Sequence, residues 1–522
     1  MKNLTSSIYD FEKLRTNNYL YIDKTEYVWR LIEQVGESYF LSRPRRFGKS
    51  LLVTTLKAVF EGKKELFRGL ALYDKPYDWK QYPVISISFA NISLGTAQDL
   101  TMFLQDELAE ISRAMKIPLR GHSIVKQFEY LIEDLAGSSP AGQAVVLIDE
   151  YDKPILGNIG DLAQCQEILN VLKGFYSNIK KCGASIRLAF ITGVSKFSHV
   201  SLFSDLNNLK DITLNPDYAE MLGFSERDIR ENFADRLPEA AKANEMSEEE
   251  LMRRLLTWYD GYRFSDADTH VCNPVSLTSF FDNGYRFSNY WDSTGTPSFL
   301  LKLMGDKAYS PETALDDWYD ESIFAAYELD RLDITGLLWQ TGYLTISDVR
   351  RDDDELQYRL DFPDREVQET FNRRLLELYA GEKKDSEAWS LVRQFRTAIR
   401  NDDLEGFLTL FQSFLACISY QIQIHEEKYY QSVFFVVFKL LGASIEAESC
   451  TNQGRIDAYV RTKTTVYIFE FKLDKSADEA VGQIVDRRYF EKFQSSGLPI
   501  RMIGVNFDSK MGRIDGWKEL QA

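Results

Sequence analysis

The 522-residue sequence holds few of the residues that mark disulfide-rich, zinc-binding or membrane proteins. Its five cysteines stand singly, without a C-x-x-C pair, which argues against a disulfide framework or a cysteine zinc site and suits a reducing compartment. Four scattered histidines are too few for a metal cluster. No apolar run reaches the roughly 20 residues of a membrane helix, and the N-terminus lacks a signal-peptide core. We therefore expect a cytoplasmic protein with no membrane partner.

Basic residues are outnumbered by acidic ones. With 62 Lys+Arg and 79 Asp+Glu, the chain carries a net charge of -17, which argues against a surface coated with basic residues for nucleic acid. The imbalance lies upstream, because residues 421–522 contain 14 basic and 14 acidic residues. This neutral C-terminal part leaves room for one local nucleic-acid groove.

Apolar strand patterns and helical patterns alternate over the first 200 residues, which predicts a parallel α/β sheet covered by helices. The expected strands are residues 38–43, 82–90, 144–151 and 184–197. Beyond them the pattern turns helical and aromatic, then strand-like over residues 334–360, then helical again to residue 420. We divide the chain into four parts: residues 1–214, a helical region of residues 215–330, a connecting region of mixed strands and helices at residues 331–420, and residues 421–522.

The segment FLSRPRRFGKSLL carries the second half of the phosphate-binding loop G-x-x-x-x-G-K-[ST]. Gly48 lets the backbone approach a phosphate, while Lys49 and Ser50 supply contacts to phosphate oxygens and Mg²⁺. Arg43 stands where the first glycine is usual, so we expect Arg43→Gly to be tolerated for nucleotide binding. Three arginines would add positive charge around the phosphates: Arg43, Arg45 and Arg46.

A second motif, VVLIDEYD, lies about a hundred residues further on. Asp149 emerges at the end of an apolar strand, where it can hold Mg²⁺, and Glu150 is placed to polarise an attacking water. Thr192 ends the next strand and is expected to sense the γ-phosphate. The alternative is a plain helix start followed by solvated carboxylates. Three motifs in this order favour ATP and Mg²⁺ as cofactors.

Longer phrases resemble a bacterial family of AAA-ATPase-like proteins that carry a PD-(D/E)XK nuclease-like domain at the C-terminal end. The phrases are YIDKTEYVWRLI, RPRRFGKS, LIDEYDKP and TGVSKFSHVSLFSDLNNLKDITL. The resemblance covers nearly the whole chain, and RPRRFGKS is the usual form of the loop in that family. It implies ATP binding at five positions, without a characterised substrate: Gly48, Lys49, Ser50, Asp149 and Glu150.

The C-terminal part contains two strand patterns, GRIDAYV and VYIFEFKL. Side-chain alternation places Glu470 and Lys472 on one face, and a hairpin would bring Asp457 to them. Two carboxylates can share a divalent metal while the lysine positions or deprotonates an attacking water. This is the D…E-x-K arrangement of restriction-endonuclease-like nucleases. The alternative is a surface strand whose acidic and basic side chains merely pair.

Helices on either side of these strands supply further candidates. Glu427 precedes the strands and is expected to face the metal. Gln483, Arg487 and Tyr489 follow them and would offer an amide, a guanidinium and a ring to a nucleic-acid backbone.

The sequence therefore predicts an α/β protein with a P-loop NTPase sheet, a helical and winged middle region, and a restriction-endonuclease-like C-terminal domain. The expected activities are ATP binding with hydrolysis and metal-dependent cleavage of nucleic acid, DNA in preference to RNA, in a homo-oligomer. Two alternatives stay open. One is an ATP-switched regulatory or scaffold protein that binds without cleaving, and the other is an ATPase with an inactive C-terminal remnant.

Overall fold

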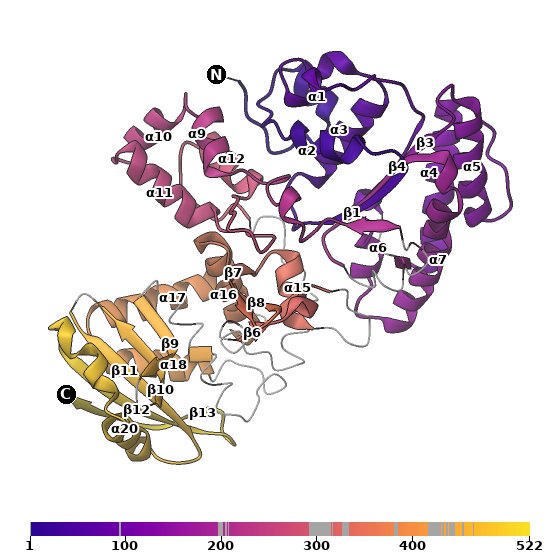
Figure 1. Cartoon of the computed structure of the whole chain (residues 1–522). Helices are drawn as coiled ribbons and strands as arrows, with labels where there is room; N and C mark the ends of the chain where they lie inside the picture. The colour runs from indigo at the N-terminus through magenta and orange to yellow at the C-terminus, as the bar shows by residue number, and fades with distance from the viewer. Residues whose placement is uncertain are drawn as a thin grey trace. The chain divides into compact units, whose positions relative to one another are not determined.

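The chain forms two compact units in the computed structural model (Figure 1). One comprises Met1–Ser293 and Trp318–Glu366, and the other comprises Thr294–Asp317 and Val367–Ala522. The structure describes these residues: 2–92, 95–196, 202, 203, 206, 208–291, 315, 317–325, 333–380, 385–415, 430, 433, 434, 437, 444–451, 454–462 and 464–521. Among them, no helix combines the length and the apolar composition needed to cross a bilayer.

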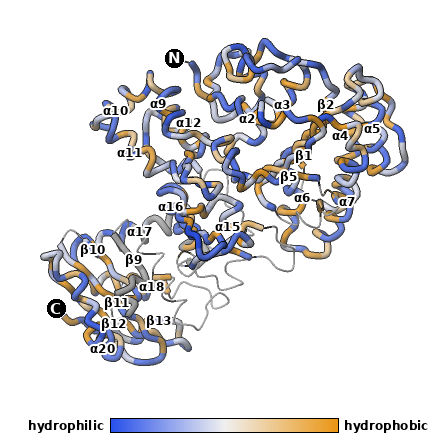
Figure 2. Tube along the Cα trace, in the orientation of Figure 1, coloured by the Kyte–Doolittle hydropathy of each residue, from blue (hydrophilic) through white to orange (hydrophobic). Residues whose placement is uncertain are grey.

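A five-stranded parallel sheet forms the centre of the first unit, in the order β2-β3-β4-β1-β5. The strands are β1 (Glu37–Ser42), β2 (Val84–Ser88), β3 (Ala144–Asp149), β4 (Ile186–Gly193) and β5 (Leu209–Asp211). Every residue of β3 and β4 is buried, as expected of parallel strands covered on both faces. Figure 2 shows hydrophobic residues gathered along these central strands.

Helices cover the two faces of this sheet with different sets of side chains. On one face, Val146 and Ile148 belong to a core shared with α4 (Ala97–Met115), α5 (Ile124–Ser138) and α7 (Leu162–Lys181). A stacked pair of rings, Phe128 on α5 and Phe175 on α7, joins two of these helices at a centroid distance of 4.1 Å. On the other face lies α3 (Lys49–Phe60), the helix that follows the phosphate-binding sequence.

Four short helices form a second core in the same unit: α9 (Glu226–Asn232), α10 (Leu237–Ala243), α11 (Glu248–Tyr259) and α12 (Pro274–Asp282). Ser225 and Ser247 start α9 and α11 with capping boxes, which fix where these polar-faced helices begin. A small antiparallel sheet, β6-β8-β7, follows; it comprises β6 (Trp318–Tyr319), β7 (Thr345–Asp352) and β8 (Glu355–Asp361).

The prediction of strands from residue 334 onward is wrong for its first part. Residues 334–341 form α15 (Ile334–Thr341), a fully buried helix. Asp333 caps its start by accepting a hydrogen bond from the Gly336 amide, and Gly342, at φ 88°, ends it in the left-handed region. Because every face of α15 is buried, its sequence has no polar stripe that would separate a helix from a buried strand.

In the second unit, three helices with described bounds precede a five-stranded mixed sheet. The helices are α16 (Arg365–Ala380), α17 (Asp385–Arg400) and α18 (Leu404–Leu415). The sheet has the order β13-β12-β11-β10-β9, with only β11 and β12 parallel. Its strands are β9 (Ser444–Thr451), β10 (Gly454–Arg461), β11 (Val466–Leu473), β12 (Ile500–Asp508) and β13 (Arg513–Gln521). Together with the first sheet, this confirms the predicted α/β class.

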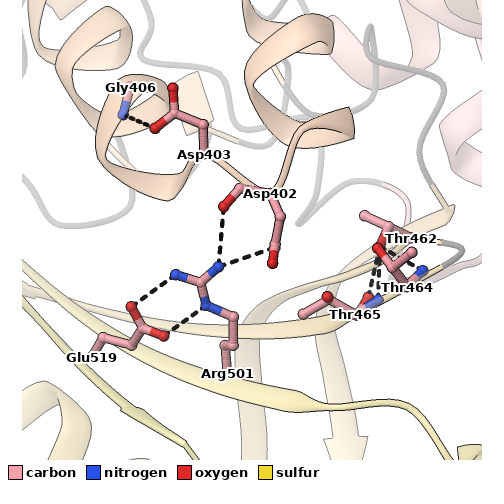
Figure 3. A network of polar contacts seen from close by, with 8 residues as sticks. All are labelled: Asp402, Asp403, Gly406, Thr462, Thr464, Thr465, Arg501 and Glu519. Atoms are coloured by element: carbon pink, nitrogen blue, oxygen red, sulfur yellow. Dashed lines mark hydrogen bonds and ion pairs between the residues drawn. The ribbon is translucent and has the colours of Figure 1, made fainter.

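A partly buried arginine ties the turn between two helices of this unit to its sheet (Figure 3). Arg501, on β12, forms a two-pronged ion pair with Glu519 on β13, at 2.6 and 2.8 Å. Its remaining nitrogen donates to Asp402, in the turn between α17 and α18, at 3.0 Å. On one face of the sheet, Phe434 packs against Phe469 and Phe471 of β11. The opposite face is covered by α20 (Ala477–Asp486), which is the side that carries the polar site.

Candidate functional sites

The loop between β1 and α3 has the geometry of an anion-binding turn. Gly48 precedes α3 at φ 91°, a left-handed conformation that favours glycine, and no side chain caps the helix. The first amide groups of α3 are therefore left for a ligand, at the end of the helix that attracts negative charge. Lys49 is buried, and its Nζ donates to the carbonyl oxygens of Arg43 and Pro44, both at 2.8 Å. Burial lowers the Lys49 pKa to about 8, against the opposing effect of Asp149.

The end of β3 supplies the oxygen atoms that a Mg²⁺ ion would need beside this loop. Asp149 is 3 % exposed, and the Ser50 side chain hydrogen-bonds to it. Its Oδ1 has no hydrogen-bond partner among the described residues, and burial raises its pKa. A buried carboxylate oxygen without a partner next to a serine hydroxyl fits an oxygen-binding cation. Asp149 and Ser50 would hold it.

Glu150, the predicted base, sits in an uncommon backbone conformation. Its φ is 53°, a value that residues with side chains seldom adopt. Its carboxylate is one-third exposed and lies 3.6 Å from Lys153 Nζ. The side chain is thus held next to a cation at the carboxyl edge of the sheet, close to the loop that ends in Lys49.

The three arginines of the loop have three different environments. Arg43 is 1 % exposed, donates to the carbonyl oxygens of Ser42, Thr213 and Tyr218, and lies 4.2 Å above the Phe264 ring. Its guanidinium is therefore built into the protein core, and burial lowers its pKa to about 9. The expectation that Arg43 lends charge to phosphates is not supported by this placement.

The other two arginines lie nearer the surface. Arg46 donates to the Tyr290 carbonyl oxygen at 2.9 Å and adopts φ 69°, which points to a role in holding the loop against the helical region. Arg45 is exposed, and its positive charge acts on Lys49. Of the three arginines, Arg45 has the environment that best suits contact with a phosphate.

Thr192 is not brought to the loop surface. The residue is fully buried, and its Oγ1 donates to the Leu41 carbonyl oxygen of β1 at 2.8 Å. Its hydroxyl is used to link neighbouring strands, so a γ-phosphate sensor at this position would have to break that bond. Sequence reasoning missed Asp152 nearby, a buried acid whose only signal was its place directly after the IDEY motif.

The helical region and the C-terminal end of α15 form one wall of the phosphate loop. The Phe47 ring packs edge-on against Tyr262, at a centroid distance of 4.7 Å. The backbone of Gly342 lies so close to Pro44 that a Cβ atom on Gly342 would come within 2.6 Å of the proline Cβ. Tyr262 in turn donates to the Gly342 carbonyl oxygen at 3.2 Å. The loop conformation is therefore set partly by residues far along the chain.

An apolar cavity opens beside Gly48. Its wall comes from the N-terminal segment, the loop with α3, and the helical region; its lining includes Ile8, Tyr21, Phe47, Leu222 and Val275. No sequence pattern pointed to this cavity, because its lining is drawn from segments more than 200 residues apart.

In the second unit, β10 and β11 bring the predicted carboxylates together. Ala458 pairs with Phe469, so the next residues along, Asp457 and Glu470, lie opposite each other on antiparallel strands. Asp457 accepts a hydrogen bond from the Phe471 amide at 2.8 Å. Glu470 is 1 % exposed, and Lys472 Nζ donates to its Oε1 at 3.2 Å. Burial, followed by the charge of Asp457, raises the Glu470 pKa to about 8.

The helix α20 packs against the sheet face that carries Asp457, Glu470 and Lys472. Gln483, on α20, donates from Nε2 to Glu470 Oε1, and its side chain also hydrogen-bonds to Tyr489. Tyr489 is 2 % exposed, so its ring packs in the core and is not presented at the surface, where a nucleic-acid backbone would bind. Arg487 is exposed at the C-terminal end of α20. Of the three residues predicted to bind nucleic acid, Tyr489 is therefore buried, Gln483 contacts Glu470 and Arg487 is exposed.

The donor atoms of this group fit a divalent cation. Glu470 Oε2 is buried and has no hydrogen-bond partner among the described residues, while Asp457 lies beside it. Oxygen ligands of this kind suit Mg²⁺ or Mn²⁺. Glu427, predicted to face the metal, lies outside the described residues. Within the described part, no cluster of three or more Asp, Glu, His or Cys side chains forms a cation site.

Comparison with known proteins bears on both sites. The family described as Predicted AAA-ATPase matches residues 6–203, and the PD-(D/E)XK nuclease superfamily matches residues 425–517. A protein of Azotobacter chroococcum mcd 1, described as an uncharacterized protein in the vnfD 5′ region, is 37% identical over 527 residues, which span 99% of this chain and 98% of the relative. The chain belongs to the AAA-ATPase-like family with a C-terminal PD-(D/E)XK domain. The family resemblance seen in the sequence is confirmed.

Proposed function

We propose that this protein binds and hydrolyses ATP at the β1–α3 loop and cleaves phosphodiester bonds of nucleic acid, DNA in preference to RNA, at the Glu470 site. The observation that carries the proposal is the buried Glu470 carboxyl group, which lies among Asp457, Lys472 and Gln483 and keeps one oxygen without a hydrogen-bond partner in the described part of the chain. A polar oxygen without a hydrogen-bond partner is costly inside a protein, so such an atom marks a place for a cation.

At the ATP site, the amide groups at the start of α3 and the Lys49 ammonium would hold the phosphates. Mg²⁺, when bound by Asp149 and Ser50, would neutralise phosphate charge. Glu150 would orient the attacking water and accept its proton on a carboxylate oxygen. The apolar cavity beside Gly48 supports the assignment, because a purine base attached to phosphates at the loop needs an apolar recess of this kind.

At the nuclease site, Asp457 and Glu470 would hold a Mg²⁺ or Mn²⁺ ion, which when bound would lower the pKa of its water and polarise the phosphate. Lys472 would orient the attacking water through its ammonium hydrogens. Gln483 would keep the Glu470 carboxylate in place through its hydrogen bond. Arg487, exposed at the end of α20, would contact a backbone phosphate.

The test is cleavage by the full-length protein. Supercoiled plasmid, linear duplex, single-stranded DNA and RNA of the same sequence are incubated with the protein, with and without ATP, Mg²⁺ and Mn²⁺. We expect metal-dependent cleavage of DNA that is lost in Glu470→Ala and retained in Glu479→Ala. Glu479 is a matched control because it is an exposed carboxylate on α20, paired with Lys475 at 2.8 Å.

A wild-type protein that binds these nucleic acids but cuts none of them would contradict the nuclease proposal. The regulatory or scaffold alternative would then take its place. Cleavage that survives in Glu470→Ala would place the active site elsewhere.

A further inference from the structure

Tyr151 and Asp152, which follow Glu150, form side-chain and backbone hydrogen bonds with residues at the end of β4. Asp152 is 1 % exposed, and its Oδ2 accepts hydrogen bonds from the Ser195 amide and the Ser195 hydroxyl, both at 2.7 Å. The Val194 amide also donates to this carboxylate, at 3.2 Å. One buried carboxylate thereby gathers three donors from the segment that leaves β4.

Tyr151 adds a second set of bonds between the same two segments. Its amide donates to the Thr192 carbonyl oxygen at 3.1 Å, and its hydroxyl donates to the Ser195 carbonyl oxygen at 3.0 Å. Gly193 makes the approach possible: a Cβ atom there would come within 2.5 Å of the Tyr151 ring and 2.6 Å of Asp152 Oδ1. The turn after β3 and the end of β4 are thus in direct contact.

Glu150 lies between two stretches of backbone that are bonded to β4 and to the residues that follow it. On its N-terminal side, Ile148 is paired with Ile191 in the sheet. On its C-terminal side, Tyr151 and Asp152 are bonded to residues 192–195. The φ of 53° at Glu150 is unfavourable for a residue with a side chain, so it needs neighbours that fix the backbone on both sides. Asp152 supplies the larger share of those bonds.

We infer that Asp152 is a positioning residue for ATP hydrolysis. Its carboxylate bonds the turn between β3 and α6 (Lys153–Leu156) to Val194 and Ser195. These bonds hold Glu150 in the backbone conformation that it needs to act on water. The inference rests on the proposed ATPase function. Asp152 is 1 % exposed and its carboxylate already accepts hydrogen bonds from Val194 and Ser195, so we assign it to positioning and not to contact with the nucleotide. In Asp152→Asn, an NH₂ group would replace one of the two carboxylate oxygens and would face a donor of Val194 or Ser195. The substitution therefore breaks a hydrogen bond while the side-chain volume changes little.

The test separates an effect through Glu150 from a loss of structure. Single-turnover hydrolysis of radiolabelled ATP, nucleotide affinity and the thermal unfolding midpoint are measured for full-length Asp152→Asn, Glu150→Gln and the double variant. We expect Asp152→Asn to lower the hydrolysis rate about 100-fold, the cost of a misplaced reacting group, and to change affinity less than about threefold. In the Glu150→Gln background the same change should lower the rate less than about twofold, because the two residues act as a unit.

Two further variants distinguish an effect on Glu150 from a general loss of stability. Ser195→Ala removes one donor with little risk to folding, and its smaller loss of rate should likewise vanish in the Glu150→Gln background. Asn178→Ala is the structural control, because Asn178 is equally buried and donates to the Val125 carbonyl oxygen on α5 at 2.8 Å. It should lower the unfolding midpoint without depending on Glu150.

The inference is overturned if Asp152→Asn hydrolyses ATP at the wild-type rate, or if its loss of rate is equally large in the Glu150→Gln background. A wild-type protein without ATPase activity, or a Glu150→Gln variant as fast as wild type, instead refutes the proposed role of Glu150 and removes this inference with it.

Discussion

Lys472 donates a hydrogen bond to Glu470 across 3.2 Å, from two positions further along the same strand. The two side chains share a face of β11, so the ammonium lies directly beside the carboxylate. Even so, burial and the nearby charge of Asp457 hold the Glu470 pKa at about 8, well above its ordinary value of 4.5. One lysine does not offset two carboxylates in this buried place, and a divalent cation would.

Metal binding at this site should strengthen as the pH rises. The Glu470 carboxyl, with its pKa raised to about 8, is protonated at neutral pH and must lose that proton to bind a cation. The affinity for Mn²⁺ should therefore rise by up to about tenfold per pH unit between about pH 6 and 8 and level off above that range. Calorimetric titration of nucleotide-free protein measures it. Glu470→Gln should abolish the pH-dependent part, and a wild-type affinity that is flat with pH would contradict the assignment.

Lys472→Ala should separate metal binding from cleavage. Removing the ammonium leaves both carboxylates in place and takes away a positive charge that repels the cation, so Mn²⁺ affinity should be equal or higher. Cleavage of plasmid DNA should be lost, since the lysine would orient the water. ATP hydrolysis should persist, because its residues lie in the other unit. Lys475→Ala, an exposed lysine on the same domain, is the matched control, and cleavage at the wild-type rate by Lys472→Ala would exclude a catalytic lysine here.

Lys49→Ala should abolish nucleotide binding. The Lys49 ammonium is buried at the loop and donates to the loop's own carbonyl oxygens, so its positive charge would face phosphates bound there. Calorimetry with ATP and Mg²⁺ should detect no binding. Lys57, a partly exposed lysine on the same helix, is the control, and Lys57→Ala should bind ATP as the wild type does. Equal affinities for ATP in the two variants would contradict the assignment of the loop as a nucleotide-binding site.

Arg43→Gly should destabilise the fold, contrary to what the loop motif alone suggests. The variant loses charged hydrogen bonds to three carbonyl oxygens and the contact with Phe264, and it leaves a buried gap. We expect the free energy of unfolding to fall by about 3 kcal/mol. Arg45→Ala, an exposed change in the same loop, should shift it by less than about 0.5 kcal/mol. Denaturant unfolding of both variants measures the difference, and equal stabilities would show that Arg43 is dispensable to the fold.

Sequence reasoning reached the parts of this molecule that are encoded locally. The buried run before Asp149 predicts its own strand, and alternation predicts that Glu470 and Lys472 share a face. It did not reach contacts made over long distances in the sequence. Arg43 looks like a phosphate ligand until its carbonyl partners near residue 213 come into view, and Asp152 looks like any acid after a strand until Ser195 is found against it.

The fit of Gly342 against Pro44 has a consequence for how the protein is made. Pro44 and Phe47 leave the ribosome early, but Gly342 and its neighbours follow nearly 300 residues later. At about 5–20 residues per second, the phosphate loop waits roughly 15–60 s for the residues that complete its wall. During that interval its apolar side chains are uncovered, so the newly made N-terminal segment should depend on chaperones until two-thirds of the chain exists.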